Sequence, residues 1–329
     1  MVDLYLHVGA WKTGTTTLQR RVFPSYDAYV GGHSSSSNSL LYAQLHRCLF
    51  SHKKLRDPTG KSWQHDVEIF LSKARATKLS RILASDESLW GHLPDVVADP
   101  SRRDAVETLA QQLHGIRERM HPDEHLRVAL TIRSQWTILP SMYAEAASRG
   151  FEPSQDGLDA FVARQLSSHS PGPLHWYENI RHLEGAIGAE NLSVHVFEDG
   201  MKRVAEGILR ALDPTAGLTD IPPRSNSGGG SSGDTWMMKR RHWARAAMEF
   251  PSSVWPVDVL PRTRLAVRRA LGAEQAILIG HRLAKRSDRR YRDEITVTDS
   301  RQRAIRSYFA ESNNGLAEHL KRDLTSLGY

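Results

Sequence analysis

Residues 7–19 (HVGAWKTGTTTLQ) combine glycine, lysine and threonine in a pattern that suits an anion. Gly9 and Gly14 have the G-x-x-x-x-G spacing of phosphate-binding loops, in which glycine lets the backbone approach a ligand closely. A nucleotide triphosphatase has lysine directly after the second glycine, whereas Lys12 lies inside this loop. The pattern therefore predicts a site for a phosphate-like group and disfavours ordinary ATP or GTP hydrolysis. Hydroxyl groups for such a site follow the second glycine, on Thr15, Thr16 and Thr17.

Short apolar runs alternate with helix-like patterns over roughly the first 200 residues. The runs predict strands within residues 2–8, 81–88, 125–134 and 191–199. Apolar residues at helical spacing predict helices within residues 15–25, 66–79, 105–120, 137–150 and 158–166. This alternation is typical of an α/β fold with a parallel sheet covered by helices on both faces. Ligands of such sheets bind beyond the carboxyl ends of the strands, where the loop after residues 2–8 is expected to lie.

The chain is expected to form one domain over residues 1–329, which is long enough to bury a sizeable core. We expect an α/β core in residues 1–221, a flexible Gly/Ser loop in 222–234 and a mainly helical, arginine-rich section in 235–329. The net charge is +7; residues 236–329 hold 19 Lys or Arg against 10 Asp or Glu, which is +9 and leaves −2 for the rest. Such a basic section is either solvated surface or an electrostatic guide for an anionic ligand. No nucleic-acid-binding motif accompanies it, so no nucleic-acid partner is expected.

Cysteine usage and hydropathy predict a cytoplasmic protein. Cys48 is the single cysteine, so no internal disulfide can form. The first residues lack the basic and apolar regions of a signal peptide. No run approaches the ~18 apolar residues of a membrane span. No feature of the sequence predicts an oligomeric state.

The stretch KTGTT, directly after a predicted strand, resembles the 5′-phosphosulfate loop of the sulfotransferases that use 3′-phosphoadenosine 5′-phosphosulfate (PAPS). The longer segment is most similar to the bacterial branch, whose loops often read His-x-Gly-x-x-Lys-Thr-Gly-Thr-Thr-x-Leu-Gln. Trp11 departs from that branch, which more often has a smaller residue there. The resemblance implies a P-loop-like sulfotransferase fold. It also implies that the donor is bound by Lys12, Thr13, Gly14, Thr15, Thr16 and Thr17.

A second motif agrees with this resemblance. In the family, an arginine at the end of a later strand and a serine eight residues on bind the 3′-phosphate of the donor. Here Arg133 closes the apolar run of residues 125–134, and Ser141 follows eight residues later. Family members often have Asp-Pro or Asn-Pro after the arginine, whereas Ser134 and Gln135 follow it here, which allows a different local turn.

The resemblance implies in-line transfer of a sulfuryl group from PAPS to a hydroxyl or amine, with adenosine 3′,5′-bisphosphate as the product and no metal requirement. Lys12 would stabilise charge on the bridging oxygen as the sulfur–oxygen bond breaks. Glu87, which follows the apolar run RILA, would be the general base, since relatives acting on sugars or tyrosine often use a glutamate. His7 is the alternative base, although it lies inside a predicted strand and can simply pack there.

Two other functions stay open at this point. One is a P-loop nucleotide kinase or hydrolase, which the position of Lys12 and the lack of an evident Mg²⁺-binding aspartate disfavour. The other is a non-catalytic anion-binding protein on the same fold, which the presence of Lys12, Arg133 and Ser141 together disfavours. The expected acceptor of a sulfotransferase is a saccharide or glycoconjugate, and the residues after Gly150 that should shape its pocket do not identify it.

Overall fold

The computed structural model describes residues 1–31, 36–51, 54–91, 104–150, 154–167, 172–212, 231–232, 235–239 and 292–329. The chain divides into two compact units. The first contains Met1–Leu139, Ala163–Ser227 and Asp299–Tyr329, and the second contains Pro140–Val162 and Gly228–Thr298. Both units are groups of contacts within one chain, so the predicted single domain stays a prediction. Of the predicted Gly/Ser loop, only residues 231–232 are among those described.

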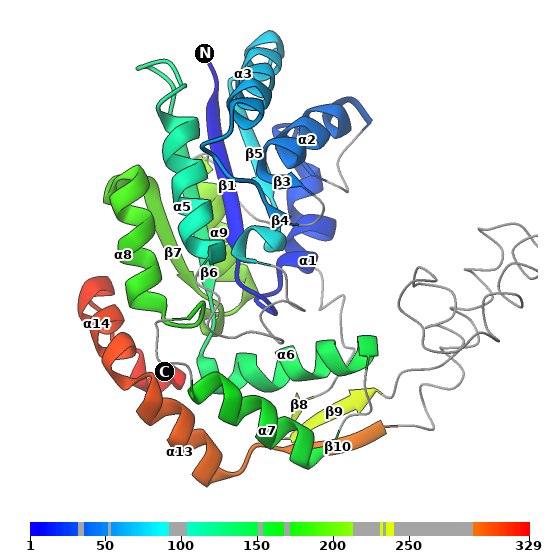
Figure 1. Cartoon of the computed structure of the whole chain (residues 1–329), viewed down its shortest axis with the longest axis vertical. Coiled ribbons are helices and arrows are strands. Elements are labelled where there is room, and N and C mark those ends of the chain that lie inside the picture. Colours follow the sequence, from blue (N-terminus) through cyan, green and yellow to red (C-terminus); the bar gives the residue numbers. More distant parts are fainter. Residues whose placement is uncertain are drawn as a thin grey trace, which may run out of the picture. The chain divides into compact units, whose positions relative to one another are not determined.

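A five-stranded parallel sheet forms the centre of the first unit (Figure 1). Its strand order is β2-β5-β1-β6-β7, and every neighbouring pair is parallel. The strands are β1 (Asp3–Gly9), β2 (Tyr29–Val30), β5 (Arg81–Ser85), β6 (Leu126–Ile132) and β7 (Leu192–Val196). All except β2 coincide with the predicted apolar runs. The predicted α/β fold with a parallel sheet is confirmed.

The strand order reverses direction around β1. From β1 the chain moves outward to β2 on one side, returns to β5, and then crosses to β6 and β7 on the other side. Open α/β sheets bind their ligands beyond the carboxyl ends of the strands at such a reversal, which here is the carboxyl end of β1. The loop that follows Gly9 begins at this point.

Helices lie on both faces of the sheet, as right-handed connections in opposite directions require. In Figure 1, α5 and α8 lie in front of the sheet and α9 lies behind it. The helices of the first unit are α1 (Thr15–Thr17) with its continuations η1 (Leu18–Val22) and η2 (Phe23–Ser25), α2 (Ser36–Leu49), α3 (Lys61–Ala76), η3 (Glu87–Trp90), α5 (Asp104–Arg117), α8 (Trp176–Ile187), η4 (Ala189–Asn191), η5 (Phe197–Asp199), α9 (Met201–Leu212), α13 (Asp299–Tyr308), α14 (Ala310–Leu320) and η7 (Thr325–Leu327). A short antiparallel ladder joins β3 (Phe50–Ser51) to β4 (Lys54–Leu55). None of the helices among the described residues is long and apolar enough to cross a bilayer.

An apolar cluster holds the helical segment after the loop against the sheet. Tyr5, Leu83 and Ala129 contribute from three adjacent strands. The helical members of the cluster are Leu18, Val22, Phe23, Val204, Ala205, Ile208 and Leu209. Burying one large apolar side chain stabilises a fold by about 1.5–3 kcal/mol, so this cluster fixes the segment that begins at the loop.

The second unit contains a three-stranded antiparallel sheet of order β10-β9-β8. Its strands are β8 (Ser231–Ser232), β9 (Thr235–Lys239) and β10 (Arg292–Thr296). Helix α6 (Gln135–Gly150) begins in the first unit and continues into the second, and α7 (Gln155–Leu166) leads back. The helical prediction for residues 235–329 agrees with α13 and α14 but misses β9 and β10, because their pairing joins residues far apart in sequence. Residues 240–291 of that section lie outside those described.

Candidate functional site

Three segments that follow strands meet at the carboxyl edge of the main sheet. The loop after β1 carries Lys12, the segment after β5 carries Glu87, and the segment after β6 carries Arg133. Because β5 and β6 flank β1 on its two sides, the sheet itself brings these three predicted residues to one edge. Lys12, Glu87 and Arg133 are many tens of residues apart in the sequence, and the strand order alone brings them to the same edge of the sheet.

The loop of residues 10–14 has a strained backbone at its lysine. Lys12 has a φ of 62° and Gly14 has a φ of 80°, so both lie in the left-handed region. This conformation costs a residue other than glycine about 1–2 kcal/mol. Strain of this kind is concentrated at functional sites. The side chain of Lys12 is exposed, so the loop presents its lysine to solvent at a conformational cost.

The two glycines of the loop are favoured for different reasons. A Cβ on Gly9 would collide with the Thr15 methyl group. Gly14 has a positive φ of 80°, which favours glycine, whereas the end of Met201 that a Cβ there would meet belongs to a flexible side chain. Packing therefore explains Gly9, and backbone conformation explains Gly14.

The threonines of the loop and of the helical segment after it differ in burial. Thr13 is fully buried, and its hydroxyl donates a 2.6 Å hydrogen bond to the Ala10 carbonyl, so this side chain folds the loop. Thr15 and Thr17 are also buried, whereas Thr16 is half-buried. No side chain caps the helical segment that begins at Thr15. The first N–H groups of such a segment have no partner within it and suit an anion.

Glu87 lies against the loop. It begins η3, and its Oε2 accepts a 2.7 Å hydrogen bond from the Thr15 hydroxyl. The adjacent Asp86 has a different role, because its carboxylate accepts from the Ser88 N–H at 2.8 Å and from the Tyr42 hydroxyl at 3.0 Å. Asp86 thus caps η3, while Glu87 is exposed at the loop. The structure brings together the predicted base and the predicted donor-binding loop.

Trp11 makes a second link between the same two segments. Its side chain is buried, and its indole N–H donates a 2.9 Å hydrogen bond to the Gly91 carbonyl at the end of η3. Trp11 and Thr15 therefore clamp η3 to the loop at both ends of η3. This contact gives a physical reason for a bulky residue at a position where the similar loops more often have a small one.

Arg133 holds the loop from the opposite side. Its Nη1 donates a 2.9 Å hydrogen bond to the carbonyl oxygen of Lys12, the residue with the strained φ. Its Nε donates to the Thr137 hydroxyl at 3.0 Å, and its guanidinium stacks 4.8 Å from the centre of the Phe197 ring. Arg133 is thus brought to the rim of the loop, where it braces the backbone of Lys12.

Ser141 lies in α6 within the second unit, and 8% of its surface is exposed. Lys12, Glu87 and Arg133 belong to the first unit. The structure therefore brings together the three residues of the first unit, and the pairing of Ser141 with Arg133 stays a prediction.

His7 is sealed inside the sheet. It is fully buried, its Nδ1 lies 2.8 Å from the Ser85 hydroxyl, and its Nε2 lies 3.0 Å from the Thr131 hydroxyl. Burial, with a smaller contribution from His195, lowers the pKa of His7 to about 3. A ring with both nitrogens engaged and no exposed surface favours a structural role over that of a base.

No protein-family model and no curated protein matches this chain. Within the described parts of the chain, no group of three or more His, Cys, Asp or Glu side chains is arranged to hold a metal ion. The residues that can hold an anionic cofactor are those of the loop, and Arg133 beside it.

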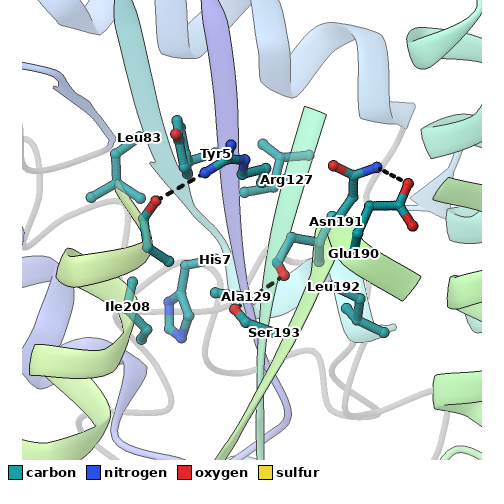
Figure 2. A pocket seen from close by; sticks show the side chains of 13 residues that line it. Tyr5, His7, Leu83, Arg127, Ala129, Glu190, Asn191, Leu192, Ser193 and Ile208 are labelled. Atoms are coloured by element: carbon teal, nitrogen blue, oxygen red, sulfur yellow. Dashed lines mark hydrogen bonds between the residues drawn. The ribbon is translucent and has the colours of Figure 1, made fainter. Parts of the chain in front are cut away.

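A cavity of about 110 Å³ lies elsewhere, among β1, β6, β7 and α9 (Figure 2). Tyr5 and Arg127 lie toward one end of it, and His7 and Ser193 lie toward the other. Its lining comes mainly from the amino-terminal halves of β6 and β7, away from the edge that carries Lys12. The cavity is therefore not the predicted site, because the strained loop, Glu87 and Arg133 lie at the carboxyl edge.

Sequence reasoning missed the residues that support the site. Phe197 and Met201, which contact Arg133 and Gly14, follow β7. Phe197 lies near the end of the predicted strand of residues 191–199, and Met201 follows it. This was a usable signal, because the carboxyl ends of parallel strands share one edge. Ser85 and Thr131 gave no such signal, since hydroxyl groups inside apolar runs do not reveal their partners.

Proposed function

We propose that this chain is a PAPS-dependent sulfotransferase that transfers a sulfuryl group to a hydroxyl or amine of a saccharide or glycoconjugate. The observation that carries the proposal is the contact of Thr15 in the loop with Glu87. It joins an anion-binding loop with an internal lysine to a carboxylate suited to proton abstraction. A binding loop alone has no need of an exposed carboxylate at its edge, because a negative charge there opposes anion binding.

The residues of the loop fit a donor with a 5′-phosphosulfate. Backbone N–H groups at the start of the helical segment and the half-buried Thr16 suit the 5′-phosphate. Thr13 supports the fold of the loop instead, because its backbone N–H and its hydroxyl both donate to the Ala10 carbonyl, at 3.3 Å and 2.6 Å. PAPS would supply the sulfuryl group. Arg133 at the rim suits the 3′-phosphate, because an arginine–phosphate contact is charge-assisted.

In the proposed transfer, a bond forms between the acceptor oxygen and sulfur while the bond from sulfur to the bridging oxygen breaks. Glu87 accepts the proton of the acceptor hydroxyl. Lys12 stabilises the negative charge that develops on the bridging oxygen, and that charge leaves on adenosine 3′,5′-bisphosphate. Catalysis of this kind rests on positioning and electrostatics, which the clamped loop and η3 supply.

A transfer assay with sulfur-labelled PAPS tests the proposal. Acceptors would include saccharides, glycolipids, peptides and small phenols, each with Mg²⁺ and with a chelator. We expect label transfer to at least one saccharide-bearing acceptor, equal with and without the chelator, and strongly reduced in Lys12→Ala. Mg²⁺-dependent release of phosphate from ATP, with no sulfuryl transfer, would instead favour the kinase or hydrolase alternative.

A further inference from the structure

His7 links the two strands that carry the other site residues. It lies in β1, and its ring reaches Ser85 in β5 on one side and Thr131 in β6 on the other. Ser85 precedes Glu87 by two residues, and Thr131 precedes Arg133 by two residues. The imidazole therefore joins the ends of both strands just before each reaches the edge of the sheet.

The same hydrogen-bond network includes the segment after the loop. The side-chain amide of Gln19 donates to the Ser85 carbonyl at 3.0 Å and to the Ser85 hydroxyl at 3.2 Å. Ser85, His7 and Thr131 are each at most 2% exposed. A buried polar network of this kind rigidifies its surroundings when its groups are satisfied. It occupies positions where the neighbouring strand residues are apolar.

The chemistry of the ring suits a fixed link. A neutral imidazole has one donor and one acceptor nitrogen, and here each nitrogen has a hydroxyl partner. The Phe23 ring packs edge-on against it, with the ring centres 5.5 Å apart. With its pKa lowered to about 3 by burial, the ring stays neutral around physiological pH, so its two bonds do not change there.

We propose that His7 is a positioning residue, whose ring fixes the ends of β5 and β6 against β1 and so sets where Glu87 and Arg133 lie relative to Lys12. The functional part of this inference rests on the proposed sulfuryl transfer, whereas the structural part does not. It assigns to His7 a role other than that of general base.

Two substitutions test the two hydrogen bonds of the His7 ring separately; we call them the Ser85 arm and the Thr131 arm. The amide of Asn reaches the position of Nδ1, so His7→Asn keeps the Ser85 side and loses the Thr131 side. The longer Gln reaches the position of Nε2, so His7→Gln does the reverse. Two backbone amides report on the arms: the Ala10 N–H donates to the Thr131 carbonyl at 3.0 Å, and the Asp86 N–H donates to the His7 carbonyl at 3.2 Å.

Amide hydrogen exchange measures the structural effect directly. Losing one buried hydrogen bond should speed exchange at the affected arm roughly tenfold. We expect faster exchange of Ala10 in His7→Asn and of Asp86 in His7→Gln. Thr131→Val should reproduce the first effect. His319→Gln changes a histidine of α14 instead, whose Nε2 lies 2.7 Å from Oε1 of Glu184, and should change neither amide.

Kinetics and nucleotide binding measure the functional effect. We expect His7→Asn to raise the dissociation constant of adenosine 3′,5′-bisphosphate more than it lowers kcat, because Arg133 loses its support. His7→Gln should lower kcat more than it weakens binding, because Glu87 loses its support.

Three results are decisive. Abolished turnover in both variants with unchanged exchange of both amides would make His7 the base and overturn the proposal. Amide exchange that becomes uniformly faster along the chain, with nucleotide binding and kcat affected alike in both variants, would show that His7 only packs in the core. That result would also overturn the proposal. If the wild type binds no adenosine 3′,5′-bisphosphate, the proposed function fails, while the selective exchange of Ala10 and Asp86 still decides whether the link exists.

Discussion

The hydroxyl of Thr15 donates a 2.7 Å hydrogen bond to the carboxylate of Glu87, across 72 residues of sequence. Thr15 begins the helical segment after the loop, and Glu87 begins the segment after β5. The bond fixes a carboxylate beside the loop that carries Lys12. Under the proposed function, this contact is what distinguishes a sulfuryl-transfer site from a simple anion-binding site.

Glu87→Gln should lower turnover by roughly 10²–10⁴-fold, the usual effect of losing a general base. Donor affinity should change little, since the amide oxygen of Gln can still accept from Thr15. Thr15→Val should lower turnover less, because it removes the bond but keeps the base, and Thr15→Ser should be nearly normal. Steady-state kinetics of the three variants check this order, and normal turnover in Glu87→Gln would exclude Glu87 as the base.

Lys12→Ala should cut turnover by about two orders of magnitude or more, the scale of losing one electrostatic group at the transition state. Lys12→Gly is the matched control, because it removes the same charge and also relieves the strained φ of 62°. We expect equal loss of activity in the two variants, with Lys12→Gly more stable than Lys12→Ala by about 1 kcal/mol. Urea denaturation measures the stability difference. Full activity in either variant would remove Lys12 from the mechanism.

Arg133→Ala should weaken the binding of adenosine 3′,5′-bisphosphate more than that of 5′-AMP. The difference in binding free energy should be about 1.5–3 kcal/mol, the contribution of a charged hydrogen bond. Both nucleotides should lose some affinity, because Arg133 also supports the Lys12 carbonyl. Ser141→Ala should show the same preference with a smaller loss, near 1 kcal/mol. Arg133→Lys keeps the charge but not the planar fork or its stacking on Phe197, so it should recover only part of the affinity. Calorimetry with the two nucleotides decides, and equal losses for both would place the 3′-phosphate elsewhere.

His7, which is fully buried, and His195, which is half-buried, predict a loss of stability in acid. Burial lowers the pKa of His7 to about 3 and that of His195 to about 4, while an unfolded histidine titrates near 6.5. The unfolded chain therefore binds more protons below pH 6.5, so stability present at neutral pH is lost as the pH falls toward the folded values. Each histidine should cost about 2–3 kcal/mol between pH 6.5 and 4.5.

Urea denaturation at pH 7 and pH 4.5 measures this loss. His7→Gln and His195→Gln should each lose less stability between the two pH values than the wild type, because carboxylate titration is common to all three proteins. Identical losses of stability in the three proteins would show that folding does not lower the pKa of these two histidines.

The strands could be predicted because each is a short apolar run with its own signal. Most residues of β1, β5 and β6 are buried, whereas β7 is half-buried except at Val196, and the apolar runs followed all four strands closely. Their order could not be predicted, because pairing is decided by contacts between segments far apart in sequence. Helix α9 was missed although Val204, Ala205, Ile208 and Leu209 have helical spacing, so in that case a usable signal was overlooked.

At the site, the types of residue could be predicted and their contacts could not. Lys12 and Arg133 were identified by the resemblance of their motifs and Glu87 by its position after a strand, and the sheet brings all three to one edge. The brace from Arg133 to the Lys12 carbonyl and the Trp11–Gly91 bond depend on loop conformation, which the residue types do not determine. His7 was considered as a base because sequence cannot show that both ring nitrogens are engaged.

The most direct test of the central claim is a calorimetric comparison of adenosine 3′,5′-bisphosphate with ADP, without Mg²⁺. Both nucleotides carry two phosphates, but only the first has the 3′-phosphate and single 5′-phosphate of the proposed donor product. No acceptor needs to be known for this measurement. The account predicts that adenosine 3′,5′-bisphosphate binds at least about tenfold more tightly, a difference of about 1.4 kcal/mol, and that Lys12→Ala keeps much of this preference. Equal affinities, or tighter binding of ADP that requires Mg²⁺, would contradict it.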